Sequence, residues 1–151
     1  MKIKFLFLTL FVLTFNLSSC QKQTKPNCAL NERIIHIDKF YKEHITGWDN
    51  YDEYIGILKK YCSSNLFDKI NKMLETHELD HDPFINAQDV SATILDHLRV
   101  TTIEGKKELF EVSFRYPVQK ESERIRIKLK VVCTKDGIKI DGVGEIQGKS
   151  H

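Results

Sequence analysis

The spacing of apolar residues changes once along this chain, from the period of a helix to the period of a strand. Between residues 28 and 74, apolar side chains recur every three or four positions, as one buried face of an α-helix requires. From residue 100 onward they recur at every second position, as a strand with one buried face requires. This order predicts an α+β domain in which N-terminal helices cover the dry face of an antiparallel sheet.

Three helices are predicted in the first half of the domain. The first covers residues 28–44, with Asn27 as its N-cap, and the second covers residues 52–61. The third begins with a capping arrangement at Asn65 and frays near His77.

Four strands are predicted in the second half. They cover residues 100–103, 110–116, 125–133 and 138–141. Joined in order, they form a curved, four-stranded antiparallel sheet with one wet face. A turn at residues 119–122 sets Val112 opposite Leu129, so that apolar side chains meet on the dry face.

The first twenty residues predict export and lipid attachment. Lys2 and Lys4 precede an apolar run at residues 5–15, which is too short to span a hydrocarbon core of about 30 Å. The run ends in the letters LSSC, which resemble the lipobox of bacterial lipoproteins. In that motif the cysteine, here Cys20, receives a diacylglyceryl group before the peptidase cuts in front of it.

The chain is therefore expected to have three parts. Residues 1–19 are a lipoprotein signal peptide, residues 20–27 hold the lipidated Cys20 and a polar tether, and residues 28–148 form a single α+β domain. Two or three acyl chains anchor a protein stably to a membrane. Because the tether lacks an acidic surface-export cluster, we expect an outer-membrane lipoprotein of the cell envelope that faces the periplasm.

The charge balance argues against nucleic acid as a partner. The chain has 23 Lys and Arg residues against 21 Asp and Glu residues, and loss of Lys2 and Lys4 with the signal peptide makes the balance even. A neutral surface of mixed sign does not favour a polyanion or an anionic membrane face.

Three cysteines remain once Cys20 carries lipid. In an oxidising compartment two of Cys28, Cys62 and Cys133 can pair, and their spacing leaves the pairing open. Cys133 lies on an apolar strand face, so we expect it to be a buried small hydrophobic residue.

The segment HELDHDPFINAQD, residues 77–89, contains the letters of a zinc protease motif. A zinc protease needs His77 and His81 on one helical face. Pro83 disfavours helical geometry in the residue before it, so we expect the helix to end before His81 and no zinc to bind. A calcium loop is also disfavoured, because Ile85 stands where the EF-hand pattern needs glycine.

We interpret the same segment as a structural turn that also binds a ligand or partner. Asp80 and Asp82 are expected to accept hydrogen bonds from their own backbone, while Pro83 stiffens the bend and Phe84 fills the core. The candidate binding residues are Asp80, Asp82, Pro83, Phe84, Gln88 and Asp89.

The other candidate sites are supported by weaker sequence evidence. His36 and His44 are interpreted as surface histidines, and the inward strand positions are nearly all apolar, which favours a filled core over an acid/base site. One strand presents basic side chains on its wet face, which we interpret as a partly salt-bridged surface, with docking of an acidic partner as the alternative. They are Arg124, Arg126, Lys128 and Lys130.

Several stretches resemble a known family. They are FYKEH at 40–44, YDEYIGILKKYCSSNLFDKI at 51–70, LDHDPFINAQD at 79–89 and DGIKIDGVGEI at 136–146. They are similar to small bacterial exported proteins grouped as domain-of-unknown-function family 3828, with Asp-Pro-Phe and Ala-Gln-Asp as the most specific signature. The order of elements is similar to the cone-shaped nuclear transport factor 2-like fold.

These features favour a non-enzymatic, lipid-anchored periplasmic module that needs no cofactor and binds a ligand or an envelope component. The alternative is an immunity-type protein that inhibits a cell-wall-degrading effector by plugging its site with the 80–89 loop or the basic strand. A metal-dependent hydrolase is the weakest of the three hypotheses. The oligomeric state stays open.

Overall fold

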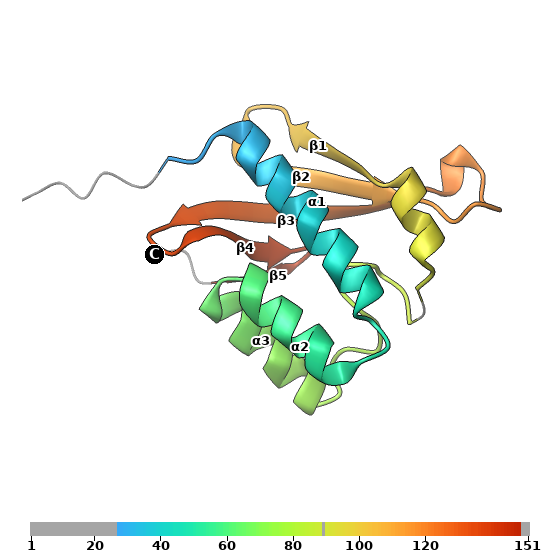
Figure 1. The fold of residues 1–151 in the computed structure, drawn as a ribbon, viewed down its shortest axis with the longest axis horizontal. Helices are drawn as coiled ribbons and strands as arrows, with labels where there is room; N and C mark the ends of the chain where they lie inside the picture. Colours follow the sequence, from blue (N-terminus) through green and yellow to red (C-terminus); the bar gives the residue numbers. More distant parts are fainter. Residues whose placement is uncertain (1–26, 89, 149–151) are drawn as a thin grey trace, which may run out of the picture.

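The computed structural model describes residues 27–88 and 90–148, in which helices cover one side of a single sheet (Figure 1). The helices are α1 (Leu30–Thr46), α2 (Tyr51–Tyr61), α3 (Ser64–Glu75) and the short 3-10 helices η1 (Ala92–His97) and η2 (Glu121–Glu123). The strands are β1 (Arg99–Ile103), β2 (Lys106–Phe114), β3 (Ile125–Thr134), β4 (Gly137–Val143) and β5 (Ile146–Gln147). The predicted α+β class is confirmed. The predicted signal peptide, Cys20 and Asp89 lie outside the described residues.

The sheet is an antiparallel meander in the order β1-β2-β3-β4-β5. Prediction of four strands missed β5, whose two residues are too few to show an alternating pattern. The register between β2 and β3 also differs from the prediction, because Val112 faces Ile127 and not Leu129. A shift of two residues keeps every side chain on its own face, so the apolar pattern could not exclude it.

Two helices begin at residues other than those predicted. Helix α1 begins after Ala29, not Asn27, and the Glu32 carboxylate accepts the Ala29 N–H at 2.9 Å. Helix α3 begins after Ser63, not Asn65, because the Ser63 hydroxyl accepts a backbone N–H of the first turn.

One apolar core joins the helices to the sheet. In β3, Ile127, Leu129 and Val131 are buried, whereas Arg126 and Lys128 are exposed, which confirms that the strand has one wet face. The largest fully buried side chains are Tyr41, Phe40, Phe84, Phe110, Phe114, Ile37, Leu58, Leu66, Ile70, Ile85, Ile94 and Leu129. Within the described residues, none of the helices combines the length and the apolar character needed to cross a membrane.

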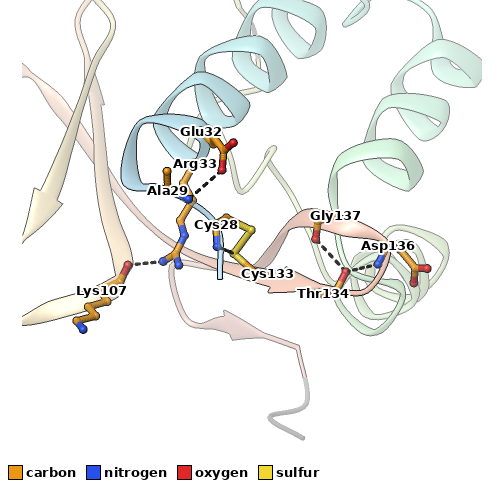
Figure 2. Close-up of a disulfide and its surroundings, with 9 residues drawn as sticks. All are labelled: Cys28, Ala29, Glu32, Arg33, Lys107, Cys133, Thr134, Asp136 and Gly137. Atoms are coloured by element: carbon orange, nitrogen blue, oxygen red, sulfur yellow. Dashed lines mark hydrogen bonds between the residues drawn. A yellow bond between two sulfur atoms is a disulfide. The ribbon is translucent and has the colours of Figure 1, made fainter. Parts of the chain in front are cut away.

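A disulfide fastens the beginning of α1 to the sheet. Cys28 pairs with Cys133 of β3, 105 residues later in the chain (Figure 2). The expectation that Cys133 is a free, buried residue is therefore wrong. Arg33 adds a second link, because its Nη1 donates to the backbone oxygen of Lys107 in β2 at 2.7 Å (Figure 2). The start of α1 is thus held to two neighbouring strands.

Cys62 is the free cysteine of the described residues, and it is buried at the end of α2. Its backbone forms a bridge to Ile140 of β4, and burial raises the pKa of its thiol well above the ordinary value. Because the reactive species is the thiolate, burial and a raised pKa both suppress the reaction.

We expect Cys62 to resist iodoacetamide at pH 8 in the folded protein and to react fully in 8 M urea. Mass spectrometry of the peptide that contains Cys62 measures the alkylated fraction under each condition. Rapid alkylation of this peptide without denaturant would contradict the burial of the thiol.

Candidate functional site

A partly open pocket of about 380 Å³ lies where the end of α1, the start of α2, the end of α3 and residues 79–88 meet. We call residues 79–88 the DPF loop and the cavity the DPF pocket. Its lining residues are Trp48, Asp49, Tyr51, Tyr54, Leu74, Leu79, Asp80, His81, Asp82 and Gln88. The structure thus brings three of the predicted site residues, Asp80, Asp82 and Gln88, to one cavity.

The helical side of the pocket depends on a tight turn between α1 and α2. Gly47 ends α1, and a Cβ atom at this position would lie 2.7 Å from Cδ1 of Ile57. Glycine therefore permits the close approach of the two helices, which places Trp48 against Tyr54 with ring centroids 5.7 Å apart. Sequence reasoning did not identify these aromatic walls, although the letters GWDNY between two helical stripes mark the turn.

A buried carboxylate organises the floor of the pocket. Asp82 Oδ1 accepts hydrogen bonds from the backbone N–H groups of Phe84 and Ile85, at 2.7 and 3.0 Å. Its Oδ2 accepts the Tyr54 hydroxyl at 2.9 Å and lies 3.0 Å from Nε2 of His44. Because a carboxylate only accepts, the His44 ring is oriented with its Nε2–H donating. Asp82 therefore links the DPF loop to both α1 and α2.

The interpretation of His44 as a surface histidine is wrong, since its side chain is fully buried. His44 follows Phe40 and Tyr41 on the same helical face, and this i+3 and i+4 spacing was the signal for burial. Aromatic rings surround the imidazole, with centroid distances of 4.9 Å to Phe40, 5.1 Å to Tyr54, 5.5 Å to Phe84 and 6.0 Å to Trp48.

The buried polar cluster of His44, Tyr54 and Asp82 has a structural role in the protein. Burial, with the Asp82 charge as the next cause, raises the pKa of Tyr54 far above its usual value, so the hydroxyl keeps its proton and donates. The side chains of His44 and Asp82 are both 0 % exposed, so solvent does not reach them. Nδ1 of His44 has no hydrogen-bond partner within the described part of the chain.

The DPF loop is a closed turn. The Asp82 N–H donates to the Ala87 oxygen at 3.1 Å, and the Asn86 N–H donates to the Asp82 oxygen at 2.7 Å. Asn86 has φ 55°, a left-handed conformation that asparagine tolerates. The Phe84 ring is fully buried. The predicted Asp82 turn and the predicted core position of Phe84 are confirmed.

Asp80 behaves differently from the prediction. Its carboxylate pairs with Nδ1 of His81 and accepts no hydrogen bond from its own backbone among the described residues. Its side chain is 82 % exposed, and its backbone oxygen accepts Nε2 of Gln88 at 3.0 Å. Asp80 therefore stands at the rim of the pocket, two residues from the buried Asp82.

The zinc protease motif is not on a helix. Helix α3 ends at Glu75, and His77 has φ 55°, so the chain leaves the helix before either histidine. This confirms the expectation that the helix ends before His81. In the described ranges, no group of three or more His, Cys, Asp or Glu side chains is placed to hold a metal ion.

The basic strand face is salt-bridged. Arg126 pairs with Glu111 at 2.6 Å, and Lys130 pairs with Asp141 at 2.9 Å. Arg124 is buried and contacts Glu121, and this hydrogen bond is the main cause that lowers the pKa of Glu121 to about 2. The interpretation as a partly salt-bridged surface is confirmed, except that Arg124 is not on the wet face.

Comparison with known proteins shows a fold that this chain shares with two solved structures, but it assigns the chain to no family. No family model matches the chain, and no curated protein matches it. A protein of unknown function from Bacteroides thetaiotaomicron VPI-5482 is similar, with TM-score 0.63, 22 % identity, and coverage of 75 % of this chain and 88 % of that chain. A chain of the type VI effector-immunity complex Tae3-Tai3 from Ralstonia pickettii is also similar, with TM-score 0.55, 13 % identity, and coverage of 79 % and 97 %. At such identities the likeness shows a shared fold alone.

Proposed function

We propose that this protein is a non-enzymatic, lipid-anchored module of the bacterial envelope that binds a protein partner through the DPF pocket. The observation that carries this proposal is the difference in burial between two aspartates of the DPF loop. Asp82 is buried with four hydrogen-bond partners, whereas Asp80 stands exposed at the rim two residues away. Buried groups hold the loop, and exposed groups are left to meet a partner.

A loop held in this way favours recognition. Association loses less conformational entropy when the binding surface is ordered beforehand. The rim also presents aromatic side chains of the type that dominate binding energy at protein interfaces. Tyr51 is 63 % exposed and Trp48 is half-buried, so both have area left to bury.

The proposed anchor places the pocket toward the periplasm. Seven residues lie between Cys20 and Cys28, and the eight Cα–Cα steps reach at most about 29 Å when fully extended. The disulfide at Cys28 holds the start of α1, and the 17 residues of α1 extend about 25 Å from there toward the pocket. In Figure 1 the end of α1 and the loop after α3 lie across the molecule from the start of α1. A disulfide also suits an oxidising compartment.

The specific form that we favour is an immunity-type protein for a cell-wall-degrading effector. The fold shared with a chain of the Tae3-Tai3 effector-immunity complex supports this form. The DPF pocket and loop would then cover the effector's site. We also propose that the chain belongs with domain-of-unknown-function family 3828, because Asp82, Pro83 and Phe84 match that family's signature. We propose in addition that it belongs with the nuclear transport factor 2-like folds, because helices cover one side of its antiparallel sheet (Figure 1).

The test uses purified candidate effectors encoded beside this gene. The full chain, with its anchor in nonionic detergent, is expected to bind one effector and to block its cleavage of peptidoglycan. Trp48→Ala combined with Tyr51→Ala should weaken binding by about 30-fold or more, the effect of losing an interface hot spot. Ile35→Ala combined with Val118→Ala removes two exposed apolar side chains outside the pocket; this matched control should leave binding unchanged. Equal affinity of the two variants would contradict a site at the DPF pocket.

A further inference from the structure

No lysine or arginine of the described residues lines the DPF pocket, whereas Asp49, Asp80 and Asp82 do. Residues 43–58 and 73–98 contain no Lys or Arg, yet they hold ten of the 21 acidic residues of the chain. Within the residues that the structure describes, only Glu43 of these ten forms an ion pair with a lysine or arginine, namely Lys60. The even charge balance of the domain therefore conceals an acidic pocket. Its field attracts positively charged groups toward the pocket.

The lining of the pocket combines this negative charge with aromatic faces. Trp48 and Tyr54 meet edge to face, at an interplanar angle of 87°, and Tyr51 stands exposed beside them. Asp49 also lines the pocket, and no hydrogen bond or ion pair engages its carboxylate within residues 27–88 and 90–148. Aromatic faces next to carboxylates form a site that attracts an organic cation by charge and by the ring quadrupole together.

Other ligand classes suit the pocket less well. An apolar ligand would remove water from the Asp49 and Asp80 carboxylates without replacing their hydrogen bonds, which is unfavourable. A metal ion needs several converging ligands, and the described residues offer no such group. The volume of about 380 Å³ is at the small end of the usual range for ligand pockets of about 300–1,000 Å³, which suits a single side chain.

We infer that the DPF pocket receives a cationic side chain of the partner, an arginine or a lysine, between its aromatic wall and its carboxylate rim. This inference rests on the proposed partner-binding function and specifies the chemistry of the group that enters. Arginine suits the site better than lysine, because its planar guanidinium stacks on aromatic rings and pairs with carboxylates through two hydrogen bonds. The other acidic residues of segments 43–58 and 73–98 add to the field that steers a basic surface of the partner toward the pocket.

Trp48 supplies a direct readout, since it is the single tryptophan of the chain. The full chain in nonionic detergent is titrated with N-acetyl-argininamide, N-acetyl-lysinamide or the neutral N-acetyl-glutaminamide, at constant ionic strength set with KCl. We expect a saturable change in Trp48 fluorescence with the two cations, and at least tenfold tighter binding of the arginine compound than of the glutamine compound.

Paired variants test the carboxylates. Asp49→Asn combined with Asp80→Asn should weaken binding of the arginine compound at least fivefold. The matched control, Asp68→Asn combined with Asp136→Asn, removes two exposed carboxylates elsewhere and should leave binding unchanged. Circular dichroism checks that both variants keep the fold. Equal binding of the arginine and glutamine compounds, or an undiminished response in the Asp49 and Asp80 variant, would overturn the inference.

The titration separates this inference from the proposed function. If the pocket binds the arginine compound saturably and through its carboxylates, but no effector binds the protein, the inferred chemistry of the pocket holds and the proposed function does not. An effector that binds through Trp48 and Tyr51 but is not displaced by N-acetyl-argininamide would keep the proposed function and overturn the cationic side chain.

Discussion

Asp82→Ala is expected to lower the free energy of unfolding by about 3–5 kcal/mol, because it leaves several buried hydrogen-bond donors without their acceptor. The substitution removes the acceptor of the Tyr54 hydroxyl and of two backbone N–H groups, and it removes the partner of His44 Nε2. Each buried donor left without a partner costs about 1–3 kcal/mol, partly offset by water that enters the loop. Urea unfolding followed by Trp48 fluorescence measures the change.

Asp80→Ala is the matched control, because it removes a carboxylate from the same loop at an exposed position. Its effect should stay within about 0.5 kcal/mol, as is usual for surface substitutions. Asp82→Asn keeps the side-chain volume and one oxygen acceptor, so its decrease in the free energy of unfolding should lie between those of the two alanine variants. If Asp80→Ala and Asp82→Ala unfold at the same urea concentration, Asp82 does not organise the loop.

Removing the Cys28–Cys133 disulfide should cost about 3–5 kcal/mol of stability. The bond closes a loop of 105 residues, and the chain-entropy model assigns about 4.7 kcal/mol to a loop of about 100 residues. The folded state keeps the hydrogen bond from Arg33 to the Lys107 backbone, so α1 should stay docked while the unfolded chain gains freedom. Urea unfolding of the Cys28→Ser and Cys133→Ser double variant gives the value.

Dithiothreitol provides the internal control for the disulfide. The reductant should move the unfolding midpoint of the unmodified protein to that of the double variant, and it should leave the double variant unchanged. If the double variant is as stable as the unmodified protein, the loop-closure argument does not hold for this chain.

The DPF loop shows where sequence reasoning succeeds. The turn at Asp82 and the core position of Phe84 depend on local geometry. Proline restricts the backbone conformation of the residue before it, and an aspartate side chain accepts hydrogen bonds from nearby backbone N–H groups. The same reasoning failed two residues earlier. Asp80 has the same side chain and a similar position before the turn, but the tertiary structure leaves it at the pocket rim, beside His81.

His44 shows why the site itself was missed. A histidine on a helix is compatible with both solvent and core, and the choice depends on what faces it. Here the partner, Asp82, comes 38 residues later in the chain. The Cys28–Cys133 disulfide also joins segments that are distant in the chain, 105 residues apart. It could not be predicted, because spacing along the chain does not report distance in space.

The sequence by itself determined the α+β class, the order of the three α-helices and the first four strands, the wet face of β3 and the turn of the DPF loop. These follow from periodicity and turn chemistry, which act over a few residues. Only the tertiary structure decided the β2–β3 register, the Cys28–Cys133 bond and the buried contact of His44 with Asp82, and only it gathered scattered acidic residues around one aromatic pocket. Such features join distant segments, and the packing of the whole domain selects among pairings that local sequence leaves equally possible.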